Sequence, residues 1–288
     1  MLEAEGKTVI CASSRMENRE SVAKELDEHK PTRVLVASGL TGRPNVDWCE
    51  TNKEATIRVN VNGSLNLADL CSARNIHMTL FATGCIYSYD DAHPIGGPGF
   101  LEEDPPNFSG SFYSKTKGMV EDLLTCYPTV LILRLRMPIS DDLSNRSFVT
   151  KIAKYEKVVD IPNSMSTLPH LLPLSLAMAN SKLTGIYNFV NPGVISHNEV
   201  LTLYKKHVDP NFEWINFSLE EQSKILAAPR SNNKLDTTKL EAAAKQLGLP
   251  LVTIQEGVEE CMKRARAKLE EDGMYPQGLP KKLGPGNN

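Results

Sequence analysis

The sequence HMTLFATGCIY (residues 77–87) decides the fold, because it is a short apolar strand that ends at Thr83 and opens into a loop. Similar apolar runs stand before and after it, at KTVICA (7–12), TRVLVAS (32–38) and TVLILRL (129–135). Amphipathic helical segments separate these runs, and strands that alternate with helices predict βαβ units and a parallel sheet. We therefore expect an α/β protein with a Rossmann-like doubly wound sheet, whose ligands bind at the carboxyl ends of the strands.

The chain divides into three predicted parts. Residues 1–136 hold the strands of the sheet and are expected to form a nucleotide-binding domain. Shorter, proline-broken elements over 137–272 predict a smaller substrate-binding lobe from which some elements return to the sheet. Its last helix is expected over VTIQEGVEECMKRARAKLEEDG (252–273), where apolar positions recur at helical spacing before a glycine. The Pro/Gly/Asn-rich residues 273–288 are predicted to be a disordered tail.

The composition excludes several classes of protein. The 288 residues are 41% hydrophobic and 23% charged, which suits a substantial folded core, and the formal net charge of -3 is unlike that of a nucleic-acid binder. No apolar run approaches the roughly 18 residues that a membrane helix needs, and the acidic first residues lack the apolar core of a signal peptide. The six cysteines form no Cys-x-x-Cys pair and the histidines are dispersed, so we expect no metal and a reducing, cytoplasmic location.

A tyrosine and a lysine stand four residues apart in YSKTK (113–117), near the start of a helix predicted from about Ser111 to Cys126. This spacing puts Tyr113 and Lys117 on one helix face. A phenol with a pKa of about 10 transfers protons poorly at neutral pH unless a nearby ammonium stabilises its phenolate. The isolated pattern is short and occurs more often on an ordinary solvated helix. The strand-end Thr83 and the βαβ context reverse that preference and resemble the short-chain dehydrogenase/reductase superfamily.

Longer segments carry a closer resemblance. They include GLTGRPNVDWCE (39–50), FATGCIYSYDDAHP (81–94), GSFYSKTK (110–117), LRMPIS (135–140), FVTKIAKY (148–155), YNFVNPGVISHNEV (187–200) and APRSNNKLDTTKL (228–240). These segments resemble the bifunctional UDP-4-keto-6-deoxyglucose 3,5-epimerase/4-reductases, which make UDP-rhamnose, and more distantly dTDP-4-dehydrorhamnose reductase. The resemblance runs from about Arg15 to about Leu240. It implies an extended short-chain reductase that uses NADP(H) to epimerise and reduce a nucleotide 4-keto-6-deoxyhexose, giving a nucleotide-rhamnose.

By position, the resemblance makes Thr83, Tyr113 and Lys117 the reductive triad, in which Tyr113 delivers a proton to O4 while nicotinamide gives a hydride to C4. Inversion at C3 and C5 needs a base and an acid on opposite faces of the sugar, and Cys85 and Lys151 match the positions that such enzymes use. A cysteine acts as a base only beside positive charge or backbone donors, because its ordinary pKa is about 8.5. Without the resemblance, Cys85 is more often a small buried hydrophobe and Lys151 a surface lysine.

The resemblance also implies binding residues. Those for the cofactor are Tyr113, Lys117, Arg15, Gly39, Arg136 and Pro138, and those for the substrate are Cys85, Asn191 and Arg230. The planar guanidinium of Arg230 suits pyrophosphate oxygens, with a surface arginine as the alternative, and a turn Asn191 also has ordinary packing roles. Arg15 favours the 2′-phosphate of NADPH, while NAD(H) stays an alternative.

The sequence departs from the family at its start. Reductases of this kind begin with a strand and a Gly-x-x-Gly-x-x-Gly turn that holds the cofactor pyrophosphate at a helix N-terminus. Gly39 and Gly42 lack a third glycine at the right spacing, so the first strand, glycine turn and first helix are expected to be absent, with weaker NADPH binding and a gap in the sheet. A downstream start site is favoured over a truncated or spliced form and over loss of catalysis, because the catalytic residue types are present.

Two alternatives to the bifunctional enzyme stay open. One is a non-catalytic regulatory subunit, because the fold includes the regulatory subunit of methionine adenosyltransferase, although the retained catalytic residue types argue against it. The other is a monofunctional reductase of the dTDP-4-dehydrorhamnose type. The sequence does not separate UDP from dTDP, and it leaves the oligomeric state open, with a homodimer as one alternative.

Overall fold

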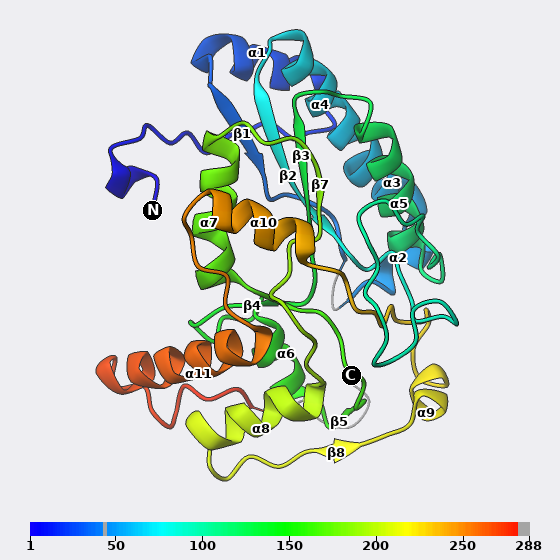
Figure 1. Ribbon diagram of the computed structural model, residues 1–288, viewed down its shortest axis with the longest axis vertical. Helices are drawn as coiled ribbons and strands as arrows, with labels where there is room; N and C mark the ends of the chain where they lie inside the picture. Colours follow the sequence, from blue (N-terminus) through cyan, green and yellow to red (C-terminus); the bar gives the residue numbers. More distant parts are fainter. Residues whose placement is uncertain (43–44, 282–288) are drawn as a thin grey trace.

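A computed structural model describes residues 1–42 and 45–281 (Figure 1). The strands are β1 (Arg33–Val36), β2 (His77–Thr83), β3 (Val130–Leu135), β4 (Pro138–Ile139), β5 (Lys157–Val158), β6 (Ser166–Thr167), β7 (Gly185–Tyr187) and β8 (Ile215–Asn216). The helices are α1 (Arg19–His29), α2 (Trp48–Thr51), α3 (Lys53–Ile57), α4 (Ser64–Ala73), α5 (Phe112–Leu124), α6 (Phe148–Lys154), α7 (Leu168–Asn180), α8 (His197–His207), α9 (Leu219–Ser223), α10 (Thr238–Gln246) and α11 (Ile254–Glu271). A 3-10 turn covers Glu3–Glu5, and a π-helical turn, Arg58–Gly63, joins α3 to α4.

The main sheet is parallel, with the strand order β1-β2-β3-β7 in the described part of the chain. Thr79 and Thr83 of β2 stand opposite Leu131 and Leu135 of β3, so these two strands end level with each other. In Figure 1 their carboxyl ends are directed toward β4 and α6. The predicted α/β class with a parallel, Rossmann-like sheet is confirmed.

Side chains that alternate along β3 pack on opposite faces of the sheet. Val130 and Ile132 join the core beneath α1, α4 and α5, whereas Leu131 and Leu133 join the core beneath α7 and α10. Period-two alternation of this kind buries both faces of a parallel sheet. The sheet therefore lies between two helical layers, as Figure 1 shows.

A second core lies beyond the ends of the strands. It is formed by α6, α8, α11 and the short strands β4 and β5, with Ile152, Tyr204 and Val258 among its buried side chains. Both β7, which pairs with β3, and α10 follow residue 136 yet belong to the sheet layers. The domain boundary after residue 136 therefore stays a prediction.

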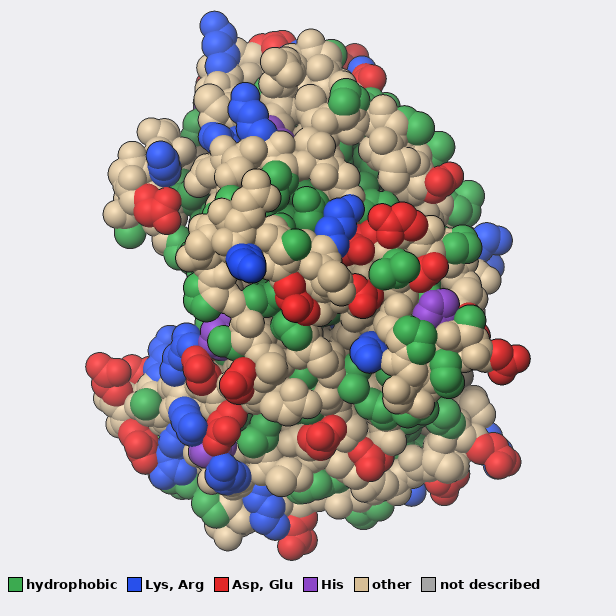
Figure 2. All heavy atoms as spheres, viewed as in Figure 1, with side chains coloured by type: hydrophobic (Ala, Val, Ile, Leu, Met, Phe, Trp, Pro, Cys, Tyr) green, Lys and Arg blue, Asp and Glu red, His purple; other side chains and the backbone are tan. Residues whose placement is uncertain are grey.

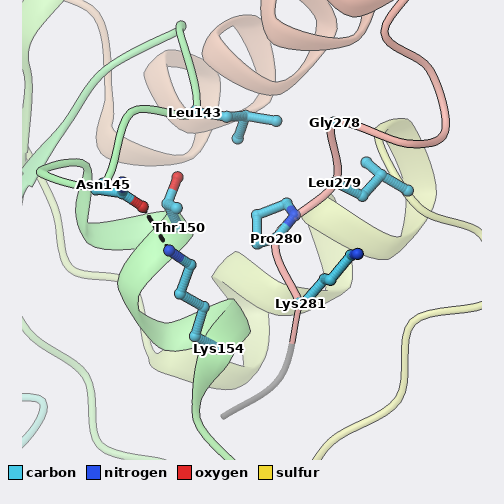
Figure 3. Close-up of a pocket in the computed structure, with 8 residues that line it drawn as sticks. All are labelled: Leu143, Asn145, Thr150, Lys154, Gly278, Leu279, Pro280 and Lys281. Atoms are coloured by element: carbon cyan, nitrogen blue, oxygen red, sulfur yellow. Dashed lines mark hydrogen bonds between the residues drawn. The ribbon is translucent and has the colours of Figure 1, made fainter.

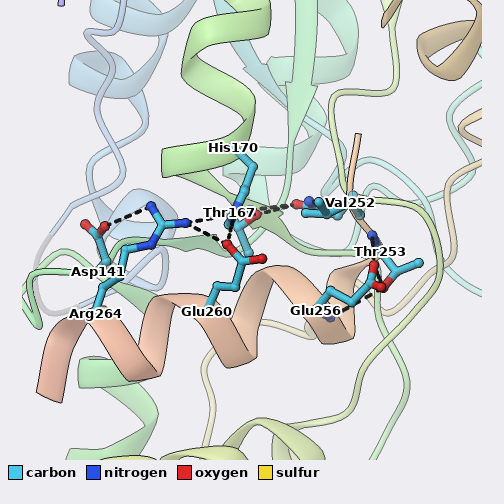
Figure 4. A network of polar contacts seen from close by, with 9 residues as sticks. Asp141, Thr167, His170, Val252, Thr253, Glu256, Glu260 and Arg264 are labelled. Atoms are coloured by element: carbon cyan, nitrogen blue, oxygen red, sulfur yellow. Dashed lines mark hydrogen bonds and ion pairs between the residues drawn. The ribbon is translucent and has the colours of Figure 1, made fainter. Parts of the chain in front are cut away.

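A polar network fastens α11 to α7 and to the loop after β4 (Figure 4). Arg264 donates to Glu260 at 2.8 Å and lies 3.6 Å from Asp141, and the same Glu260 oxygen lies 2.9 Å from Nε2 of His170. The His170 ring also contacts Thr167 at 3.0 Å. This network holds the second core against the sheet.

The segment Lys7–Ala12, which we predicted to be a strand, is not one. Val9 and Ile10 are 40% and 50% exposed, and Leu35 on the adjoining edge strand β1 is 37% exposed. A strand needs a neighbour to satisfy its backbone groups, and in the described residues no strand pairs with the outer edge of β1. The apolar pattern alone did not reveal that this partner is lacking.

The residues after α11 were predicted to form a disordered tail. Over the part that the structure describes, the Arg266 guanidinium lies 3.4 Å from the centre of the Tyr275 ring, and Leu279 packs against the second core. Residues 282–288 lie outside the described part of the chain.

The face of the molecule in Figure 2 carries lysines and arginines interspersed with acidic side chains, most densely over α8 and α11. This mixed pattern differs from the single-sign basic surface of a nucleic-acid binder. Among the described residues, no helix is both long and apolar enough to cross a membrane.

Candidate active site

Thr83 ends β2 and begins the loop that carries Cys85. The Thr83 hydroxyl oxygen accepts a hydrogen bond from the Cys85 backbone N–H at 3.1 Å. Gly84 between them lies so close to Arg136 that an added Cβ would be 3.0 Å from the Arg136 Cγ and 2.6 Å from a Leu235 methyl carbon. Only glycine allows this approach without displacement of its neighbours, and it brings Cys85 against the end of β3.

Tyr113 and Lys117 lie on α5, one turn apart. The helix begins after Ser111, whose hydroxyl accepts from the Ser114 backbone N–H at 3.1 Å. The Lys117 Nζ atom lies 6.0 Å from the centre of the Tyr113 ring, and the side chain is only 8% exposed. The predicted spacing therefore brings the phenol and the ammonium together.

Burial shifts the pKa of both groups. It raises the pKa of Tyr113, and a hydrogen bond from Thr83 offsets part of that rise. It lowers the pKa of Lys117 to about 8, with the negative charge of Glu121 acting in the opposite direction. The hydroxyls of Thr83 and Tyr113 are thus adjacent, beside a cation that titrates near neutral pH.

The loop after β1 passes beside Lys117. Asn60, from the π-helical turn, holds this loop by accepting from the Leu40 N–H and donating to the Leu40 carbonyl, each at 2.8 Å. A Cβ on the neighbouring Gly39 would lie 3.6 Å from the Lys117 Nζ atom, and Gly39 is exposed. The sequence analysis did not single out Asn60. Its position in the segment RVNVNG (58–63) gives no local sign that it holds the loop after β1.

The residues at this end of α5 fit the nicotinamide end of a dinucleotide. Within residues 1–42 and 45–281, the Lys117 ammonium makes no hydrogen bond or ion pair, so its donors are available to ribose hydroxyls beside the bare backbone of Gly39. The pyrophosphate end lacks a comparable cradle, because the described residues contain no glycine turn before a helix. Arg15 is three-quarters exposed and pairs with Glu17 at 2.7 Å.

Lys151 lies on α6 and is partly buried. Its pKa is lowered, first by burial and then by the positive charge of Arg230, while Asp47 and Cys85 act in the opposite direction. These electrostatic contacts place Lys151 in the same neighbourhood as Cys85. Lys151 therefore lies within electrostatic reach of Cys85, the other predicted proton-transfer residue of the epimerase.

Arg230, the predicted pyrophosphate ligand, forms an ion pair with Asp47 at 2.6 Å and also donates to the Ala228 carbonyl. The pair links the segment after α9 to the start of α2. Sequence reasoning did not single out Asp47, which stands 183 positions from its partner. The role of Arg230 toward a pyrophosphate stays a prediction.

Of three other predicted binding residues, two have buried side chains and one is exposed. Arg136 is 1% exposed and its guanidinium is directed inward, toward Gly84, Asn163 and Ser231. Asn191 is buried, accepts from Thr167 and donates to the Val252 carbonyl, so both of its polar atoms are engaged inside the protein. Pro138 is exposed at the start of β4. Contacts of these residues with cofactor or substrate stay predictions.

A surface pocket lies between α6, the loop before it and the residues that follow α11 (Figure 3). Its lining comes from Leu143, Asn145, Thr150 and Lys154 on one side and Gly278–Lys281 on the other. Lys154 contacts Asn145 there. None of the predicted site residues lines this pocket, so it does not define the candidate site.

Comparisons with known proteins identify the family of the chain. A family model described as the RmlD substrate binding domain matches residues 2–267. A bifunctional dTDP-4-dehydrorhamnose 3,5-epimerase/dTDP-4-dehydrorhamnose reductase of Arabidopsis thaliana is 57% identical over 249 residues, which cover 86% of this chain and 83% of the relative.

Solved structures extend the comparison. The L780 UDP-rhamnose synthase of Acanthamoeba polyphaga mimivirus superposes with a TM-score of 0.86 at 40% identity, over 91% of this chain and 92% of that one. A dTDP-4-dehydrorhamnose reductase from Bacillus anthracis, in complex with NADP, has the same fold with a TM-score of 0.71 at 18% identity, over 85% of each chain. The family resemblance predicted from the sequence is confirmed.

Proposed function

The chain belongs to the RmlD substrate-binding-domain family, and we propose that it catalyses the NADPH-dependent 3,5-epimerisation and 4-keto reduction of a nucleotide 4-keto-6-deoxyhexose to a nucleotide-rhamnose. The observation that supports the proposal is that two sets of candidate proton-transfer residues lie around the end of β2. One set is Thr83, Tyr113 and Lys117, and the other is Cys85 with Lys151.

In the reductive half, Thr83 and Tyr113 hydrogen-bond the C4 carbonyl oxygen. Tyr113 transfers its phenolic proton to O4, and the Lys117 ammonium 6.0 Å from the ring centre stabilises the phenolate that is left. A nicotinamide cofactor supplies the hydride for C4 when it is bound. Lys117 and the Gly39 backbone are the residues that would hold its ribose, with NADP(H) as the proposed form and NAD(H) as the alternative.

In the epimerising half, Cys85 as a thiolate takes the proton α to the ketone, and the C–H electron pair moves into an enolate. Thr83 and Tyr113 stabilise the enolate oxygen by hydrogen bonding, so the same groups serve both reactions. Lys151 as an ammonium returns a proton to the opposite face of the carbon. The cycle closes when the Cys85 proton passes through solvent to the neutral Lys151 amine.

The proposal also includes the nucleotide that carries the sugar, the cellular location and the assembly. We propose UDP rather than dTDP, because a UDP-rhamnose synthase that is 40% identical superposes over 91% of the chain. We also propose a cytoplasmic location, because all six cysteines are free thiols, and a homodimer as the assembly.

The experiment is product analysis with the purified 288-residue chain, NADPH and UDP-4-keto-6-deoxyglucose. We expect UDP-rhamnose and one equivalent of oxidised cofactor. The dTDP-linked sugar and NADH, supplied in parallel, rank the nucleotide and the cofactor. Formation of a reduced but unepimerised sugar would favour a monofunctional reductase, and no turnover despite sugar binding would favour a regulatory subunit.

A further inference from the structure

Arg136 is a buried cation without a carboxylate partner. It directly follows β3, is 1% exposed and forms no ion pair with any described residue. Neutral oxygens accept its hydrogen bonds: the carbonyls of Ser164, Gly84 and Ser231 at 3.2, 3.0 and 3.1 Å, the Ser231 hydroxyl at 2.9 Å and Asn163 Oδ1 at 2.6 Å. Its donors are satisfied, but its charge is not neutralised.

Arg134, two residues earlier and on β3 itself, is the contrasting case. It is 2% exposed and pairs with Glu121 at 2.7 Å. A buried cation that lacks such a partner destabilises the fold, and an anion that forms beside it offsets that cost. Burial lowers the pKa of Arg136, yet a guanidinium stays protonated throughout the physiological range.

The Cys85 thiol is the group beside Arg136 that becomes an anion on losing one proton. Its Sγ atom lies 3.7 Å from Nη1 of Arg136. The other titratable groups that face Cys85 are Lys151 on α6 and Tyr113 on α5. Tyr89 also faces Arg136, but its hydroxyl donates to the Pro162 carbonyl at 2.9 Å.

We propose that Arg136 is a positioning residue whose buried positive charge holds Cys85 as a thiolate. The consequence for catalysis rests on the proposed function, in which this thiolate is the base for C3 and C5. Arg136 itself transfers no proton and contacts no reacting carbon. Asn163 and Ser231 aim its guanidinium, so they belong to the same arrangement.

The test measures the rate at which iodoacetamide alkylates Cys85 in the full chain as a function of pH, by mass spectrometry of the Cys85 peptide. Only the thiolate reacts, so the midpoint pH of the rate reports its formation. Cys11 and Cys126 are exposed and give the reference behaviour in the same digest. We expect the Cys85 midpoint to lie about one pH unit or more below theirs, as an adjacent opposite charge produces.

Arg136→Met should raise the Cys85 midpoint, with a rate at pH 7 lower on the order of tenfold, and Arg136→Lys should restore most of the difference. Asn163→Asp is the second variant, because it keeps Arg136 in place while supplying a competing carboxylate at the 2.6 Å contact. It should raise the midpoint as well. An unchanged midpoint in folded Arg136→Met or Asn163→Asp protein would overturn the proposal.

The assay needs no sugar substrate, so the two proposals fail separately. A raised midpoint in the variants without any epimerisation by the wild type would uphold the role of Arg136 and refute the proposed function. Epimerisation by a wild type whose Cys85 midpoint matches that of Cys11 would uphold the function and refute the role of Arg136.

Discussion

The two proposed proton-transfer centres each place a nucleophilic or acidic side chain beside a buried cation, but the cations differ in kind. Tyr113 lies beside Lys117, whose pKa burial lowers to about 8. Cys85 lies beside Arg136, whose guanidinium keeps its proton. The difference means that the cation beside Tyr113 is able to lose its proton near neutral pH, whereas the cation beside Cys85 keeps its charge.

The surroundings explain why a lysine suits one centre and an arginine the other. Lys117 has an exposed glycine beside it and no hydrogen bond or ion pair among the described residues, so its three donors remain for a ligand. Arg136 is enclosed by oxygens that match its planar fork, as Asn163 and Ser231 do. We therefore expect Lys117 to bind a ligand and Arg136 to stabilise the thiolate of Cys85.

The largest expected effect comes from removal of the acid at the reductive centre. Tyr113→Phe should lower the rate of ketone reduction by about 10² to 10⁴-fold, because it removes the proton donor and little volume. NADPH oxidation with the 4-keto sugar measures the rate, and calorimetric titration with UDP-sugar serves as the control for intact binding. Reduction at the wild-type rate would remove Tyr113 from the mechanism.

The next effect separates the two centres. Cys85→Ser and Lys151→Ala should each lower epimerisation by about 10²-fold or more while reduction continues on unepimerised sugar, because each removes one proton-transfer partner. Deuterium incorporation at C3 and C5 in deuterated water, read by mass spectrometry or NMR, measures epimerisation. Full incorporation at both carbons by both variants would assign the proton transfers to other residues.

A smaller effect follows from the lowered pKa of Lys117. The charged form is present below pH 8 and is lost as the pH rises above it, so the rate of reduction should decline above about pH 8, by up to tenfold per pH unit. Lys117→Arg should move this decline to higher pH because the guanidinium stays charged. Deuterium exchange at C3 and C5 should not decline with the same midpoint, and a shared midpoint would contradict the difference between the centres.

Much of the fold was predictable because its signals are local. The strand predicted to end at Thr83 is β2 (His77–Thr83), and the helix predicted from about Ser111 to Cys126 is α5. The segment Lys7–Ala12 was predicted wrongly, because a β pattern shows only that a strand is compatible with those residues. Whether a neighbouring strand is present to complete the hydrogen bonds is a tertiary property.

The residues of the candidate site were predicted partly from spacing in the sequence and partly from the family resemblance. Spacing alone put Tyr113 and Lys117 on one helix face, since the period of a helix relates residues one turn apart. Resemblance supplied Cys85 and Lys151, and the structure places both in one electrostatic neighbourhood. The resemblance assigned Arg136 to the cofactor, and its inward direction was not visible in the sequence, because the groups that surround Arg136 lie 27 to 95 positions away.

The sequence by itself determined the succession of strands and helices and the residue types that chemistry at the end of β2 requires, because these depend on short-range periodicity. Only the tertiary structure decided which charges are neutralised. Glu121 reaches Arg134 from 13 positions away, while Asn163 and Ser231 reach Arg136 from 27 and 95 positions away. No repeating pattern in the chain encodes such distances, and the free energy of a buried charge depends on the groups that folding brings to it.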